Sequence, residues 1–406
     1  KYWRRLALEY HRLNMKEEFL QILHEGTTEE EEDFMDAYHE QREEIINMMI
    51  MLATWHDRLA LQTDKEEERE TELAKAADVL KRAEKVHEQN QPKVGVQKKG
   101  KKGDKDKDKK KEIPPNAAVL VGKGHHAMTE FRLKKKAGAK KEAVPLLNEA
   151  GTDFKRAMDE TADGDNLAAH VGNALCSYYK GDFERSLQGY RKIMVMMQQR
   201  GHVGLSHIRY AIAHCLFKLG RREQCIEALE ITVARATENE TETKVDAMCA
   251  LSDLKRVSKR DGATSSMDIL NQALVIDKND PVVMCQVANH FFMIGSKDQS
   301  EKLLDSVMRA KKYGNKGHAE AKFQLGRLEH TKDNLVGAGK LYAECLKEMP
   351  QHGGALYGMA QVRYNEGKVD VRLVRSIMGH SGGEVSLSFA GKVARDFNQG
   401  LLFSHD

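Results

Sequence analysis

The 406-residue sequence has little of what interrupts helices or builds sheets. It contains only six prolines and two tryptophans, and its β-branched residues rarely alternate with polar ones between hairpin turns. The scarcity of proline lets helices run uninterrupted, and the missing alternation argues against a large sheet. We therefore expect an all-α protein.

The six cysteines are dispersed and form no CxxC pair, which argues against a zinc knuckle. Most of them lie on apolar faces of expected helices, where a cysteine is usually a buried, reduced thiol. Reduced thiols predict a reducing compartment, either cytosol or nucleus. They are Cys176, Cys215, Cys225, Cys249, Cys285 and Cys345.

No strong charge and no long apolar run stands out. The formal net charge of +3 is too small to imply nucleic-acid binding on its own. The most apolar stretch, Ile45 to Ala53, is roughly half as long as a membrane-spanning helix must be. We recognise no signal peptide and expect no membrane partner.

The common catalytic motifs are missing as well. The sequence has no GxxxxGK(S/T) phosphate loop, no GxSxG elbow and no HExxH zinc motif. His125 and His126 are adjacent, but neighbouring residues on a helix point roughly 100° apart and rarely share one metal ion. We predict a protein that is not an enzyme and that uses no cofactor and no metal.

A repeated pattern runs through the chain instead. A tetratricopeptide (TPR) unit is two antiparallel helices, in which a large residue, a Leu, a small residue and an aromatic recur at fixed spacing on the first helix. The small residue lets neighbouring helices approach closely. The opening segment has the whole pattern, with a second helix after it: Trp3, Leu6, Ala7 and Tyr10, then Phe19 and Leu23.

The small residue after the Leu position recurs every 34 to 39 residues in the second half of the chain. It stands at Ala174, Ala213, Ser252, Ala288, Gly326 and Ala360. Turn residues keep the same step, at Gly181-Asp182, Gly220-Arg221, Asp261-Gly262, Gly295, Asp333 and Gly367. The pattern predicts a right-handed superhelical solenoid of TPR repeats, in which each unit packs on its neighbours.

The rhythm also predicts the domain organisation. We expect N-terminal TPR-like helices in 1–90, a lysine-rich disordered insertion in 91–116, a degenerate TPR-like unit in 117–165, a regular array in 166–370 and an unassigned tail in 371–406. Between the small residues Gly124 and Ala174 the step lengthens to 50, so we expect extra residues to be looped out there.

The insertion carries nine lysines and three aspartates between Lys98 and Lys111, with no apolar residue. Such a segment is either a solvated loop or a weak electrostatic contact for nucleic acid. The absence of interleaved aromatics, on which bases could stack, favours the solvated loop.

A TPR solenoid binds partners in the concave groove formed by the first helices, whose pattern positions two, five, nine and twelve point into it. Counting from the small residues assigns candidate partner-binding side chains rich in aromatic residues and arginine, as protein interfaces are. The candidates are His207, Tyr210, His214, Phe217, Asp246, Asp253, Arg256, Asn289, Phe292, Phe323, Arg327, His330, Tyr357 and Gln361. Their mixed charge favours a long extended or helical partner segment over a terminal carboxylate.

Three segments go beyond the generic repeat. They are WRRLALEYHRLNMKEEFLQIL at 3–23, HIRYAIAHCLFKLG at 207–220 and DKNDPVVMCQVANHFF at 277–292. They resemble the large TPR scaffold subunit of the polymerase-associated factor complex, which travels with elongating RNA polymerase II. The resemblance covers residues 1 to about 370 and leaves out the lysine-rich insertion and the tail.

The resemblance implies a nuclear, non-catalytic scaffold. It would hold other subunits of that complex, help attach them to RNA polymerase II, and support transcription elongation and histone modification on chromatin. The alternative is a TPR adaptor of another assembly, such as a co-chaperone or an auxiliary subunit of an N-terminal acetyltransferase.

Overall fold

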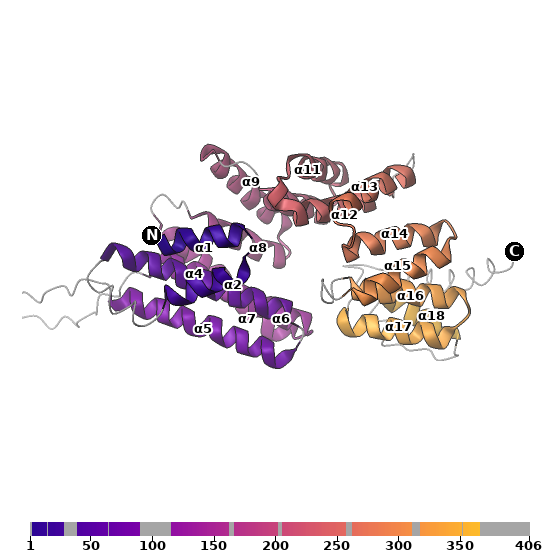
Figure 1. Cartoon of the computed structure of the whole chain (residues 1–406), viewed down its shortest axis with the longest axis horizontal. Helices are drawn as coiled ribbons and strands as arrows, with labels where there is room; N and C mark the ends of the chain where they lie inside the picture. Colours follow the sequence, from indigo (N-terminus) through magenta and orange to yellow (C-terminus); the bar gives the residue numbers. More distant parts are fainter. Residues whose placement is uncertain are drawn as a thin grey trace, which may run out of the picture. The chain divides into compact units, whose positions relative to one another are not determined.

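The computed structural model describes residues 2–13, 15–27, 39–63, 65–89, 115–161, 166–201, 205–256, 262–310, 317–350 and 352–365. These ranges are helical almost throughout and contain no strand (Figure 1). No helix in them is long and apolar enough to cross a membrane. The lysine-rich segment and the tail lie outside the described residues.

The chain divides into two compact units. Unit 1 comprises Lys1–Val203 with Ala211–Arg222, and unit 2 comprises Gly204–Tyr210 with Glu223–Asp406. Helix α10 (Ser206–Lys218) contributes residues to both units.

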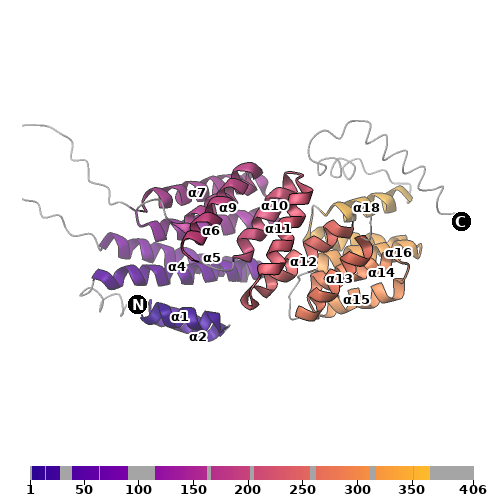
Figure 2. The same ribbon diagram turned by 90° about the horizontal axis from the view of Figure 1, so that it is seen from above.

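Unit 1 is a series of helix pairs. The first and second helices of each pair pack along each other: α1 (Tyr2–Arg12) with α2 (Lys16–Glu25), α4 (His39–Gln62) with α5 (Glu66–Gln89), α6 (Ala117–Lys136) with α7 (Lys140–Asp159), and α8 (Leu167–Tyr179) with α9 (Phe183–Gln199). The antiparallel pair of α4 and α5 is plain in Figures 1 and 2. First helices also contact one another, α4 with α6 and α6 with α8.

Unit 2 repeats the scheme after α11 (Arg222–Arg235) and a short 3-10 helix, η3 (Glu238–Glu240). Its pairs are α12 (Thr241–Arg256) with α13 (Gly262–Ile276), α14 (Pro281–Met293) with α15 (Lys297–Arg309), and α16 (His318–Thr331) with α17 (Leu335–Glu348), followed by α18 (Gly353–Asn365). The first helices α12, α14, α16 and α18 contact each other in that order. The predicted TPR solenoid fold is therefore confirmed.

The small residues lie where the two helices of a pair meet. Ala174, Ser252, Ala288 and Gly326 are all buried, whereas Ala360 is half-buried. In one pair the facing helix also carries a small residue, Ser186. Its hydroxyl donates to the Ala174 carbonyl at 2.9 Å. A short side chain on each helix is what lets the pair approach closely.

Four of the six predicted turns end first helices with left-handed backbone, whereas Asp261 and Gly367 lie outside the described residues. Gly181, Gly220 and Gly295 have φ values of +85°, +71° and +85°, and Asp333 takes the same role at +58°. A residue in this conformation stops a helix and satisfies its last carbonyl groups, and glycine adopts it without strain.

One step of the repeat was interpreted wrongly. The 50-residue spacing between Gly124 and Ala174 is not looped out, because α6 and α7 are 20 residues long each. The α14 to α18 helices have only 13 or 14 residues. Longer helices, which still pair tightly, absorb the added residues.

Candidate functional site

The sequence-predicted candidates all lie on first helices, and none of them is buried. Unit 2 holds His207 and Tyr210 on α10, Asp246, Asp253 and Arg256 on α12, Asn289 and Phe292 on α14, Phe323, Arg327 and His330 on α16, and Tyr357 and Gln361 on α18. His214 and Phe217, both exposed, belong to the part of α10 in unit 1. We call the row on α12, α14, α16 and α18 the first-helix face of unit 2.

Arg327 lies at the centre of this face. Its guanidinium carbon is 4.0 Å from the centre of the Phe292 ring and 5.7 Å from that of Phe323. Its Nη1 donates to the Asn289 side-chain oxygen at 2.8 Å. The contact with an aromatic ring and the hydrogen bond to Asn289 hold the planar guanidinium in one orientation.

Towards α12 the face is polar. The Gln286 amide donates to the Asp253 carboxylate (2.8 Å) and to the Cys249 carbonyl (3.2 Å), which ties α14 to α12. Arg256 donates to the same carboxylate at 3.2 Å. Asp253 is thus positioned by two donors.

Towards α18 the face carries an ionised acid. The Glu320 carboxylate accepts from His352 (2.9 Å) and from Gln324 (2.8 Å). Burial raises the pKa of Glu320, but these two hydrogen bonds outweigh it and leave the pKa below its usual value. The His352 ring also stacks on Phe323, with 4.7 Å between ring centres.

Glu320, Gln286 and His352 also contribute to this face and were not predicted from the sequence. Glu320 could have been found, because it stands six residues before Gly326, as Asp246 stands before Ser252. Gln286 lies outside the counted positions. His352 precedes α18 and caps it by accepting from the Ala355 amide at 3.0 Å. No position of the repeat pattern predicts this capping role.

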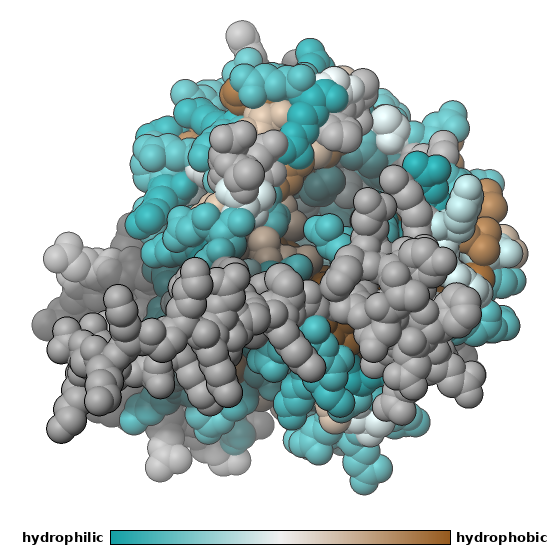
Figure 3. Space-filling model, turned by 90° about the vertical axis from the view of Figure 1, so that its left-hand side faces the viewer, coloured by the Kyte–Doolittle hydropathy of each residue, from teal (hydrophilic) through white to brown (hydrophobic). Residues whose placement is uncertain are grey.

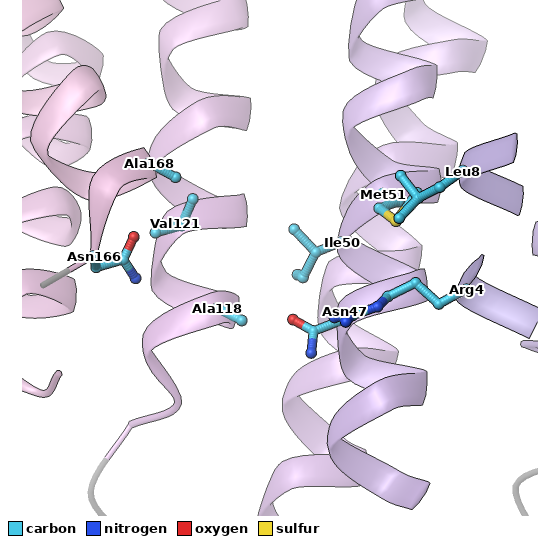
Figure 4. A pocket seen from close by; sticks show the side chains of 9 residues that line it. All are labelled: Arg4, Leu8, Asn47, Ile50, Met51, Ala118, Val121, Asn166 and Ala168. Atoms are coloured by element: carbon cyan, nitrogen blue, oxygen red, sulfur yellow. The ribbon is translucent and has the colours of Figure 1, made fainter. Parts of the chain in front are cut away.

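A second candidate lies within unit 1 and was not predicted. A cavity of about 350 Å³ is bordered on one side by α1 and α4 and on the other by α6 and α8 (Figure 4). Its lining residues are Arg4, Leu8, Asn47, Ile50, Met51, Ala118, Val121, Asn166 and Ala168. Counted from the small residues Ala7, Ala53, Gly124 and Ala174, most of them occupy positions two, five and nine of their first helices.

The adjacent histidines of α6 have a structural partner. His125 Nδ1 and His126 Nδ1 lie 3.1 and 2.7 Å from the two carboxylate oxygens of Asp57, whose side chain is only 1% exposed. Burial lowers the pKa of His126, but the hydrogen bond to Asp57 and the negative charges of Asp57, Glu130 and Glu149 together outweigh burial and raise the pKa overall. In the described part of the chain, no three His, Cys, Asp or Glu residues could hold a metal ion.

All six cysteines are free and buried, as expected. Burial raises the pKa of the Cys176 thiol to about 11 and those of Cys285 and Cys345 to about 12. These thiols stay protonated near neutral pH and lack the thiolate that nucleophilic chemistry needs.

The face shown in Figure 3 is mostly hydrophilic, with hydrophobic side chains gathered in small patches. Among the exposed large apolar residues, Met293 (65% exposed) ends α14 beside Arg327, whose Nη2 lies 4.0 Å from the sulfur. An apolar residue next to the stacked arginine extends the contact area of the first-helix face.

Comparisons with known proteins identify relatives by sequence. No protein-family model matches the chain. It is 23% identical over 373 residues to the CTR9 homologue of Arabidopsis thaliana, which covers 90% of this chain and 29% of that protein. It is 26% identical over 209 residues to the RNA polymerase-associated protein CTR9 of Caenorhabditis elegans, covering 50% of this chain and 17% of that protein.

The chain also matches proteins that are not named as CTR9 proteins. The human protein O-mannosyl-transferase TMTC1 is 23% identical over 200 residues, covering 48% of this chain and 21% of that protein. A solved TPR protein of Thermus thermophilus aligns at 16% identity over 49% of this chain and 100% of its own, with a TM-score of 0.37. The apo quorum sensor NprR of B. thuringiensis aligns at 12% identity over 76% and 84% of the two chains, with a TM-score of 0.45. The chain spans less than a third of the length of these curated relatives.

Proposed function

The chain is a divergent relative of the CTR9 proteins, and on that premise we propose that it is a non-catalytic scaffold of a polymerase-associated factor complex. It acts in the nucleus, where it holds segments of other subunits and helps to attach them to RNA polymerase II during elongation. The observation that carries the proposal is the 23% identity across 90% of the chain, since a match of that length extends over both units.

The geometry supports a binding role for the first-helix face of unit 2. Protein interfaces are enriched in aromatic residues and arginine, and a few such residues dominate the binding energy. Here Phe292 and Phe323 contact Arg327, and Tyr357 lies on the next first helix. All three rings are at least partly exposed. An extended or helical segment laid across these helices contacts several repeats at once.

The charges on this face favour a segment of mixed polarity. Asp253 and Glu320 are acidic, and Arg256 and Arg327 are basic. Because complementary charges set register and specificity more than affinity, a partner with alternating charge fits better than a run of one sign.

Affinity purification tests the proposal. The tagged chain is recovered from nuclease-treated nuclear extract of its own source, and the co-purifying proteins are identified by mass spectrometry. We expect other subunits of the polymerase-associated factor complex in stoichiometric amounts, with RNA polymerase II in smaller amounts. Recovery of chaperones, ribosomes or an acetyltransferase in their place would retain the TPR fold and reject the proposed role.

A further inference from the structure

The cavity of unit 1 combines an apolar wall with a polar rim. The wall is formed by Leu8, Ile50, Met51 and Val121, from three first helices (Figure 4). Leu8 is 48% exposed, which is high for a leucine that lines a cavity. The cavity has a volume of about 350 Å³, near the lower end of the roughly 300–1,000 Å³ of ligand sites. The space suits a few side chains.

The rim offers hydrogen-bond donors. Arg4 forms an ion pair with Glu44, whose Oε2 lies 3.0 Å from the Arg4 Nε, and the two terminal nitrogens of Arg4 have no partner among the described residues. The side-chain amide of Asn47, on the same side of the cavity, has none there either (Figure 4). Asn166 uses its oxygen to cap α8 through the Ala169 amide (3.0 Å), so its amide nitrogen stays available as a donor.

This distribution selects the chemistry of an occupant. A donor-rich rim with one fixed cation is complemented by an acceptor or an anion, and a dry wall of aliphatic side chains by an aliphatic group. Met51 is unbranched and adapts its shape to different aliphatic groups. A ligand that satisfies both parts has an aliphatic side chain directly beside a carboxylate.

We propose that the unit 1 cavity binds a partner segment in which a large aliphatic residue is followed by an acidic one. The aliphatic side chain fills the space between Ile50 and Val121, and the carboxylate accepts from Arg4 and Asn47. That the occupant belongs to a partner protein rests on the proposed scaffold role. The chemistry of the cavity stands on the lining residues alone.

Methionine methyl NMR of the full chain tests the site directly. Met51 lies in the wall, so its methyl signal, assigned through Met51→Leu, reports occupancy. The probe is a short acetylated Gly/Ser peptide that contains one Leu followed by Glu. Two matched peptides carry Lys in place of Glu, or Ser in place of Leu. The methyl signal of Met293, in unit 2, is the internal control.

We expect the Leu-Glu peptide to shift the Met51 signal in a saturable way and to leave Met293 unchanged. The Leu-Lys peptide should bind about fivefold more weakly, the effect of losing one partly exposed charge pair. The Ser-Glu peptide should give no shift. A Met51 signal that ignores the Leu-Glu peptide, or responds equally to Leu-Glu and Leu-Lys, overturns the proposal.

Two variants localise the effect. Ala168 lines the cavity and is exposed, so Ala168→Trp fills the space without disturbing the core and should abolish the Met51 response. Ala74, an exposed residue on α5 outside the lining, gives the matched control Ala74→Trp, which should leave the response intact. Arg4→Met should bring the Leu-Glu and Leu-Lys affinities to within about twofold of each other. A response that survives Ala168→Trp also overturns the site.

Failure here and failure of the proposed function are separable. The peptide titration uses the isolated chain and can succeed when no subunit of a polymerase-associated factor complex co-purifies. Purification of Ala168→Trp beside Ala74→Trp then shows which co-purifying protein depends on the cavity. If the titration succeeds and Ala168→Trp loses no protein that Ala74→Trp retains, the assignment to a partner protein is wrong.

Discussion

Arg327 contacts four side chains of α14 and α16, so its replacement is the most direct test of the first-helix face. Its stacking on Phe292 at 4.0 Å and its bond to Asn289 at 2.8 Å fix the guanidinium without burying it. A cation held in this way loses little conformational entropy when a partner arrives, so more of its contact energy is left for binding.

Replacing Phe292 and Arg327 together by alanine should weaken partner binding by about 2 kcal/mol, or roughly 30-fold, as loss of an interface hot spot does. Binding of a co-purified subunit is measured by surface plasmon resonance, and far-UV circular dichroism should show unchanged helicity. The control is Arg309→Ala with Val336→Ala, two exposed residues on second helices. Equal affinity of both double variants would remove the first-helix face from the binding model.

Glu240 shows a residue role that no repeat position predicts. Its carboxylate accepts five hydrogen bonds, from the backbone and hydroxyl groups of Ser206 and Thr237 and from the Leu205 amide, at 2.8 to 3.1 Å. Partial burial raises its pKa, but these donors lower it to about 2. The bonds join the start of α10 to η3, residues about 35 apart in sequence.

Because the folded pKa of Glu240 lies below the usual value of 4.5, its contribution to stability is complete above about pH 5 and is lost as the pH falls towards 2. Glu240→Gln should destabilise the chain at pH 7 by about 1–2 kcal/mol after allowance for solvent screening. The difference from wild type should vanish near pH 2. Urea unfolding across this range, with amide exchange of Leu205 and Ser206, measures it. A difference that does not depend on pH contradicts the assignment.

At the scale of helices, close approach depends on glycine at particular points. A Cβ at Gly172 of α8 would lie 2.4 Å from the ring of Phe154 on α7. Phe154 is 3% exposed and belongs to a buried core cluster. A Cβ at Gly151, on the same helix as Phe154, would meet the flexible end of Lys180 at 3.5 Å and the Cys176 Cβ at 3.9 Å, which are ordinary contact distances.

Gly172→Ala should therefore lower the free energy of unfolding by about 1–2 kcal/mol, because overpacking outweighs the helix propensity that alanine adds. Gly151→Ala should raise it by about 0.5–1 kcal/mol, since only the propensity term remains. Urea midpoints of the two variants, measured with the wild type, should move in opposite directions. Two shifts of the same sign would show that α7 and α8 do not pack through Phe154.

The repeat fold could be predicted because its signals are local. Small residues such as Ala174 and turn residues such as Gly181 act within one helix pair, so their spacing is visible in the sequence. The length of α6 and α7 could not be predicted, because a helix extended by two turns keeps the same pattern as a loop insertion at the same place. Tertiary pairing, which the sequence does not display, decides between them.

Contacts between repeats were less predictable than the repeats. The counted positions found Arg327 and Asn289, because both occupy position nine of successive first helices. They did not find the Asp57 contact with His125 and His126, which joins α4 to α6 across 68 and 69 residues. Nor did they indicate the unit 1 cavity, because the rule was applied only to the regular repeats.

At the scale of the whole chain, charge is concentrated in a segment that has no apolar residue. The nine lysines and three aspartates of 98–111 account for more than the net charge of +3, and their removal leaves −3. From Lys98 to Lys111 the segment contains no apolar side chain that could join a core. Its removal therefore changes the electrostatics of the chain and takes no apolar contact from the described helices.

Deletion of 98–111 should leave the melting temperature within about 2 °C of wild type, because a charged segment without apolar residues buries nothing on folding. Replacing the nine lysines by glutamine, which keeps the length, is the matched control and should give the same melting temperature. Any binding of duplex DNA at low salt should fall equally in both variants, with a shallower salt dependence, because fewer phosphates are neutralised. A drop in melting temperature on deletion but not on glutamine replacement would mean that the segment packs on the helices.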